Sequence, residues 1–223
     1  MKQYIFLTLI GLSLAGGNAS AKPPTVWHTG VLLLSNGTEL TGDLNYNWKA
    51  EIVQIRLGDG IKAYSAFHVR EFTYFDDKIN TLRKFASVEH PIRSSLRRLI
   101  VMEQLMEGPM TVYRRLRHAR EPIAKRNLSS FGNDAELTQN LDSFDYFVYK
   151  DDGVVKLDHF VRDIWPVMQQ EYHKELTQYG TTLLIDRNTT LARLLFINQY
   201  NSLKAKTADE SAGAAAPGMY GGL

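Results

Sequence analysis

Alternating apolar and polar positions in the first half of the chain predict antiparallel β-strands joined by short turns. The clearest pair covers residues 31–34 and 38–46, on either side of Asn36-Gly37. Asn-Gly favours a two-residue type I′ hairpin turn, because both central residues of that turn have positive φ. In the second strand, alternation places Leu40, Leu44 and Tyr46 on one face, so we expect a half-buried strand.

The same two-residue period continues further along the chain and predicts most of a sheet. Additional strands are expected at residues 51–57, 61–64, 69–75 and 82–88. Residues 96–106 and 110–116 most simply form a hairpin, although residues 94–106 also fit the start of a helix. The polar stretch 118–142 is expected to be a long surface loop or partly disordered, and a last hairpin is expected after it from residues 144–149 and 154–157.

After residue 157 the apolar period changes to three and four residues, which predicts helices. The first should run from about residue 160 to 179, with Asp158 as its cap, Gly180 at its end and a bend near Trp165 caused by Pro166. The second should cover residues 189–203 and be capped by Asn188. Residues 204–223, rich in Ala and Gly, are expected to form a flexible tail.

These elements predict an α+β fold. An antiparallel β domain of about seven to nine short strands should occupy residues 22–157, and two helices should follow in residues 158–203. Segregation of strands and helices along the chain favours helices packed on one face or end of an antiparallel sheet.

The first 21 residues have the pattern of a cleavable secretory signal peptide. Lys2 precedes an apolar run at residues 4–14, and small residues end the segment at Ala19-Ser20-Ala21. The run is too short to span a bilayer, and no later stretch is apolar enough to do so. We therefore predict cleavage after Ala21 and a periplasmic or secreted bacterial protein; the alternative is a buried N-terminal helix.

The amino-acid composition excludes several classes of protein function. The chain has no cysteine, which excludes a disulfide scaffold, a thiol enzyme and a thiolate zinc site. Its formal charge is +2, and loss of Lys2 with the signal would leave about +1, so net charge identifies no partner. The distribution is uneven, because residues 93–126 hold nine Lys and Arg against three Glu.

Five arginines in that stretch are a possible anion-binding cluster, since antiparallel pairing in the predicted hairpin would bring them to one end. Guanidinium groups bind phosphates and carboxylates in a bidentate manner, so a polyanion or an anionic lipid would be the partner. The alternative is a solvated edge strand whose charges prevent aggregation between sheets. The residues are Arg97, Arg98, Arg114, Arg115 and Arg117.

The sequence points to no cofactor and no metal. Its six histidines are scattered without zinc-protease spacing, and it contains no nucleophile elbow, P-loop or dinucleotide-binding glycine motif. The adjacent carboxylates at residues 76–77 and 151–152 are more typical of turns than of catalysis. A hydrolase with a cleft between sheet and helices remains an alternative, with His159, Asp158 and Tyr172 as its nearest polar candidates.

Four segments resemble a family of uncharacterised exported proteins of Bacteroidota. They are SNGTELTGDLNYN (35–47), AYSAFHVREFTYFDD (63–77), FDYFVYKDDGVVKLDHF (144–160) and FINQYNSL (196–203). The resemblance implies export and lineage, but no activity and no functional residue.

The function predicted first is therefore a non-enzymatic envelope or secreted module for interaction or structure, with an envelope or extracellular partner. The two alternatives are a binding protein for polyanions or anionic lipid, which would use the arginines, and the hydrolase.

Overall fold

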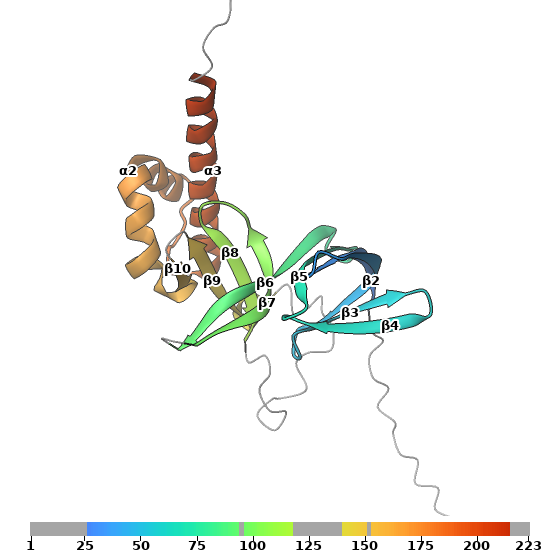
Figure 1. Ribbon diagram of the computed structural model, residues 1–223. Coiled ribbons are helices and arrows are strands. Elements are labelled where there is room, and N and C mark those ends of the chain that lie inside the picture. Colours follow the sequence, from blue (N-terminus) through green and yellow to red (C-terminus); the bar gives the residue numbers. More distant parts are fainter. Residues whose placement is uncertain (1–25, 94–95, 118–139, 151–152, 215–223) are drawn as a thin grey trace, which may run out of the picture.

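The computed structural model describes residues 26–93, 96–117, 140–150 and 153–214. Ten strands form one antiparallel sheet, and helices follow it in the chain, so the α+β prediction is confirmed. The predicted signal peptide and most of the predicted surface loop lie outside the described residues. Figure 1 shows the helices grouped beside one end of the sheet, next to β9 and β10, with the strands β1 to β4 at the opposite end.

The sheet has the strand order β10-β9-β8-β7-β6-β5-β1-β2-β3-β4. Strand β1 therefore lies between β2 and β5, and the sheet ends in β10 on one side and β4 on the other. The strands are β1 (His28–Leu34), β2 (Glu39–Asn47), β3 (Ile52–Leu57), β4 (Gly60–Ser65), β5 (Val69–Asp76), β6 (Thr81–Arg93), β7 (Leu96–Met106), β8 (Thr111–Leu116), β9 (Phe144–Lys150) and β10 (Gly153–Lys156).

The hairpin of β1 and β2 forms where predicted, but its turn is of another type. The Gly37 N–H donates to the Leu34 carbonyl at 3.0 Å, and the Leu34 N–H donates to the Thr38 carbonyl at 2.9 Å. Gly37 has φ +85°, whereas Asn36 does not have positive φ. The connection is therefore a three-residue loop that ends in a left-handed glycine, which is a common alternative to the two-residue turn.

Strands β6 and β7 form the longest hairpin of the sheet. They contain 13 and 11 residues, and β6 extends well past the predicted end at residue 88. Strand β7 pairs with β8 from Glu103 opposite Arg114, so the predicted hairpin is confirmed and the helical alternative for residues 94–106 is wrong. The extra length of β6 pairs with the first residues of β7, with His90 opposite Arg98.

The helical part begins with two irregular turns. Residues Leu157–His159 form a 3-10 helix and Phe160–Ile164 a π-helix, before helix α2 at Trp165–Thr182. Pro166 lies in the first turn of α2, where its missing N–H costs nothing. The non-helical residue inside α2 is Tyr172, so the strongest irregularity is not at the predicted bend, and Asp158 caps neither irregular helix with its side chain.

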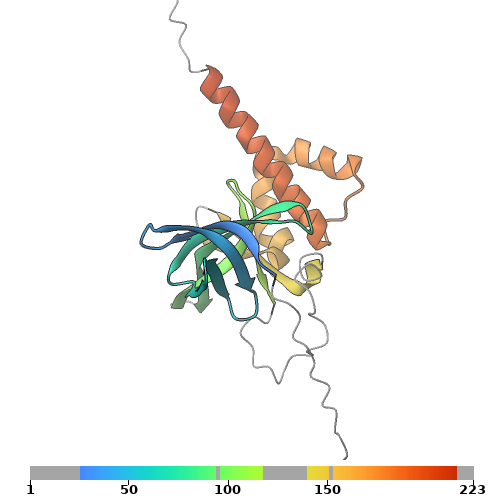
Figure 2. The same cartoon turned by 90° about the vertical axis from the view of Figure 1, so that its right-hand side faces the viewer.

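Helix α3 (Thr190–Ala214) is longer than predicted. The Thr189 hydroxyl, rather than Asn188, accepts the hydrogen bond from the Ala192 N–H at its start. Residues 204–214 continue the helix, so the predicted flexible tail does not begin at residue 204. Figure 2 shows the far end of α3 running away from the sheet. Among the described residues, no helix combines the length and apolarity that crossing a membrane would require.

One hydrophobic core joins the sheet to the helices. It includes Leu44, Phe72 and Phe85 from the sheet and Phe160 and Phe196 from the helical part, all of them buried. A smaller cluster is centred on residues from β7 and β9, namely Ile100, Met102 and Phe147.

Asn201 adds a polar connection between α3 and the sheet. Its side chain accepts a hydrogen bond from the Met110 N–H at 3.0 Å and donates one to the Met110 carbonyl at 2.9 Å. Both contacts are buried, so the turn between β7 and β8 is fixed to the last helix.

Candidate interaction site

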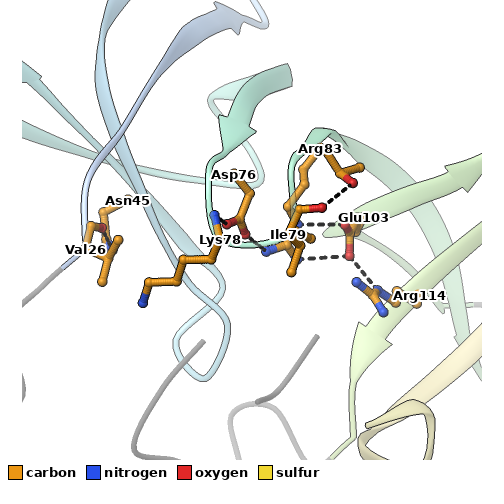
Figure 3. Close-up of polar contacts among 9 residues, drawn as sticks. Val26, Asn45, Asp76, Lys78, Ile79, Arg83, Glu103 and Arg114 are labelled. Atoms are coloured by element: carbon orange, nitrogen blue, oxygen red, sulfur yellow. Dashed lines mark hydrogen bonds and ion pairs between the residues drawn. The ribbon is translucent and has the colours of Figure 1, made fainter. Parts of the chain in front are cut away.

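Arg114, one of the five predicted anion-binding arginines, lies inside the protein. Its Nε donates to Glu103 at 2.5 Å, and its guanidinium lies 4.4 Å from the centroid of the Phe144 ring. Glu103 also accepts two hydrogen bonds from Arg83, at 2.8 and 3.1 Å, and Arg83 donates to Asp76 at 3.2 Å. Figure 3 shows this network of two cations and two carboxylates.

The charges in this network hold one another in the ionised form. Burial disfavours the charged form of Arg83, but the field and hydrogen bonds of Glu103 outweigh it and raise the pKa of the guanidinium. Burial likewise opposes ionisation of Glu103, but Arg83 and Arg114 outweigh it and lower the pKa of the carboxyl group. A buried, internally paired network of this kind maintains structure and leaves little cationic surface for a ligand.

Arg98 and Arg115 share a different buried carboxylate. Arg115 Nε donates to Glu51 at 2.5 Å, and an Arg98 nitrogen lies 3.8 Å from the same carboxylate. Glu51 is 1% exposed and has φ +54°, a backbone conformation that few residues other than glycine adopt. Sequence reasoning missed Glu51, because nothing in the turn between β2 and β3 indicates that it folds against β7 and β8.

The remaining two arginines have exposed partners. Arg117 pairs with Asp145 at 3.1 Å, and Arg97 lies 3.8 Å from Glu89. The prediction that all five arginines come together at one end of the hairpin is therefore correct only in part. The register sets Arg114 opposite Glu103 and leaves Arg97 and Arg98 opposite β6, so among the five only Arg98 and Arg115 converge on one carboxylate.

Two surface grooves flank the hairpin of β6 and β7. The first, which we call the Phe67 groove, has a volume of about 430 Å³ and lies between this hairpin and the connection from β4 to β5. The second, of about 460 Å³, lies toward β9 and β10. Glu89 and Arg97 line both. The other residues of the Phe67 groove are Ser65, Ala66, Phe67, Arg98 and Leu99.

Phe67 is held at the edge of this groove by hydrogen bonds of its neighbours. The His68 N–H donates to the Ser65 carbonyl at 2.9 Å, and the Ser35 N–H donates to the His68 carbonyl at 3.0 Å. The Ser35 hydroxyl donates to the carbonyl of Phe67 itself at 3.3 Å. The Phe67 side chain is nevertheless 74% exposed, and Leu99 in the same groove is 37% exposed. A fixed backbone thus presents a large aromatic ring to solvent.

The residues considered for a hydrolase do not form a common site in the described part of the chain. His159 contacts Arg162 and Asp163, whereas the Tyr172 hydroxyl pairs with Thr207, and no hydrogen bond or ion pair joins His159, Asp158 and Tyr172. Within the same described ranges, no three His, Asp or Glu side chains are grouped so that they would hold a metal ion.

Comparisons with known proteins give no functional assignment. No family model matches the chain, and no curated protein and no solved structure is detectably similar to it. The resemblance to exported proteins of Bacteroidota stays a prediction, so a functional proposal has to rest on the residues of this chain.

Proposed function

We propose that the protein is an exported, non-enzymatic interaction module that binds a partner protein of the envelope or extracellular space at the Phe67 groove. The exposed ring of Phe67 beside Arg97 and Arg98 is the observation that carries this proposal. Aromatic residues and arginine are enriched where protein partners bind most strongly, because they combine large contact area with directed hydrogen bonds.

The groove favours a partner segment with an apolar side chain next to a carboxylate. Phe67 and Leu99 supply the apolar surface, and Arg97 and Arg98 outnumber Glu89 among the charged lining residues. Arg97 is a suitable donor because its contact with Glu89 is long and its side chain is 72% exposed. An exposed pair of this kind contributes little, so a partner carboxylate can replace Glu89 at small cost.

This geometry supports a protein partner better than a polyanion or an anionic membrane. A polyanion would need several uncompensated cations, whereas each of the five arginines already has a carboxylate partner. Binding driven by polyanions also weakens steeply with salt, while contacts with an aromatic ring do not.

Affinity capture of a partner protein from the native envelope tests the site. The chain from Lys22 onward is immobilised for this experiment. Phe67→Ala should weaken binding of the captured protein by about thirtyfold, because aromatic residues that dominate an interface contribute about 2 kcal/mol or more. Phe75→Ala is the matched control, since Phe75 is also an exposed phenylalanine but does not line the groove. Equal recovery with the two variants, or retention on heparin that Phe67→Ala leaves unchanged, would contradict the proposal.

Export has its own test. The protein isolated from its native cells should begin at Lys22 and be found outside the cytoplasm, because the small residues before that position fit a signal peptidase site. Replacing Ala19 and Ala21 by bulky residues should leave the longer form. A native protein that begins at Met1 in the cytoplasm would refute export without affecting the groove.

A further inference from the structure

A second pocket, which we call the helical pocket, lies between α2 and α3, apart from the Phe67 groove. Its volume is about 430 Å³. Trp165, Leu176, Ile185 and Phe196 give it apolar walls. The polar residues around it are Gln169, His173, Thr177, Thr181 and Arg187. The lining is thus mixed, with five polar and four apolar side chains, which suits a ligand that has both a polar and an apolar part.

The aromatic wall is held in place from several sides. The rings of Trp165 and Phe196 lie 5.0 Å apart at 72°, and Tyr179 and Phe160 also contact Phe196. Gly180 lets the two helices approach closely, since a Cβ there would come within 2.8 Å of the Phe196 ring. The wall is therefore packed before any ligand arrives, which lowers the cost of binding.

Arg187 places a positive charge over this wall. Its guanidinium carbon lies 4.7 Å from the centroid of the Trp165 ring, and its backbone carbonyl accepts a hydrogen bond from Arg193 at 3.0 Å. Among the described residues, no carboxylate forms an ion pair with Arg187, in contrast to all five arginines of the predicted cluster. Stacking on the ring orients the guanidinium but uses none of its N–H donors.

We propose that the helical pocket binds a small amphiphile with a single carboxylate, its apolar body beside Ile185 and the parts of Trp165 and Phe196 that line the pocket, and its carboxylate on Arg187. A planar guanidinium matches the two carboxylate oxygens, and Arg187 is exposed, so its N–H donors are open to a ligand that enters the pocket. His173 and Gln169, which contact each other at 3.3 Å, offer further polar contacts at the rim.

Two test ligands distinguish the kinds of apolar part that the pocket could accept. Decanoate has an acyl chain, and 2-naphthoate has an aromatic ring system. Decanol and 2-naphthol are the uncharged controls, all used below micelle formation. Isothermal titration calorimetry of the full chain measures the binding of all four compounds. At least one acid should bind about fivefold more tightly than its alcohol, because an exposed guanidinium forms a charge-assisted pair with a carboxylate but not with a hydroxyl group.

Variants of the protein test whether the preference for the acid comes from Arg187 in the helical pocket. Arg187→Gln should remove the preference for the acid while leaving the alcohol unchanged, whereas Arg70→Gln, an exposed arginine on β5, should preserve it. Thr177→Trp, which fills the pocket from its rim, should weaken acid and alcohol together. Phe67→Ala should bind as the parent does, so the result is independent of the function proposed above.

Equal affinities for acid and alcohol would overturn the proposal. So would a preference that survives Arg187→Gln, or the absence of detectable binding of all four compounds while circular dichroism shows a folded protein.

Discussion

Glu103 lies between two buried arginines, Arg83 and Arg114, and its carboxylate pairs with both of them. It accepts three hydrogen bonds, while the Arg83 guanidinium carbon lies between 5.2 and 5.6 Å from three aromatic ring centroids. With Asp76, the network holds two positive and two negative charges. This balance allows burial, because a charge without a partner in such a place would cost several kcal/mol.

Glu103→Gln should destabilise the fold by about 3–5 kcal/mol, since it leaves two buried guanidinium groups with one carboxylate. Urea unfolding measures the change. Asp43→Asn is the matched control, because it removes a carboxylate from the exposed pair with Arg56, where little change is expected. Similar losses in the two variants would show that burial of the network does not matter.

The same residue should make stability depend on acid. The pKa of Glu103 is lower in the folded protein than the reference value of 4.5, so its contribution is complete above that pH and is lost as the pH falls through the folded pKa. The fall in unfolding free energy below about pH 4.5 should therefore be shallower in Glu103→Gln than in the parent. Parallel curves would contradict this assignment.

Leu184 is a residue in a conformation that favours glycine. It has φ +51° and is 90% exposed, and it follows α2 in a Schellman motif: the Ile185 N–H donates to the Gly180 carbonyl, and the Leu184 N–H donates to the Thr181 carbonyl. Leu184→Gly should raise the unfolding free energy by about 1 kcal/mol, because it relieves the Cβ contact of the left-handed region. Leu184→Ala, which keeps the Cβ, should not, and equal effects would contradict the explanation.

At the scale of elements, the sequence predicts the strands and helices well and their ends less well. Alternation along residues 38–46 correctly predicts the buried face of β2, with Leu44 and Tyr46 inside. The turn type, the length of β6 and the site of the irregularity in α2 depend on contacts with distant parts of the chain. Pro166 is harmless because the irregular turns before it make it part of a first turn, which local patterns do not reveal.

The candidate site was less predictable than the fold. Arginines 97, 98 and 115 were identified from composition, but the buried carboxylate of Glu51 and the exposed ring of Phe67 were not. The position of Arg114 was predictable in principle, since it alternates with the apolar residues Val112 and Leu116 along β8. Its partner Glu103 stands opposite it only in the observed register, which single-strand patterns do not fix.

The contact of Gly180 with Phe196 offers a test of how α2 and α3 pack. Gly180→Ala should destabilise the protein by about 1–3 kcal/mol despite the better helix propensity of alanine, because the new methyl group meets the ring. Phe196→Leu should make room for it, so the double variant should lose less than the sum of the two single losses. If the two losses in stability simply add, the methyl group at residue 180 does not meet the ring of Phe196, and the proposed contact between α2 and α3 is wrong.

At the scale of the whole molecule, the shared core predicts that sheet and helices unfold together. Trp48 packs in the sheet and Trp165 in the helical part, both within the same core. In variants that keep only Trp48 or only Trp165 among the three tryptophans, the denaturant transition seen by fluorescence should coincide with the one seen by far-ultraviolet circular dichroism. An earlier transition at Trp165 would show that the helices form a separate cooperative unit.

The link between Met110 and Asn201 has a consequence for the order of events when the chain is made or threaded through a narrow channel. The two residues are 91 positions apart, and both bonds are buried. A polypeptide that emerges amino end first therefore holds an unfinished interior, with apolar sheet surface uncovered, until residue 201 arrives. Apolar surface of such a chain is therefore open to non-native contacts until most of its residues have emerged.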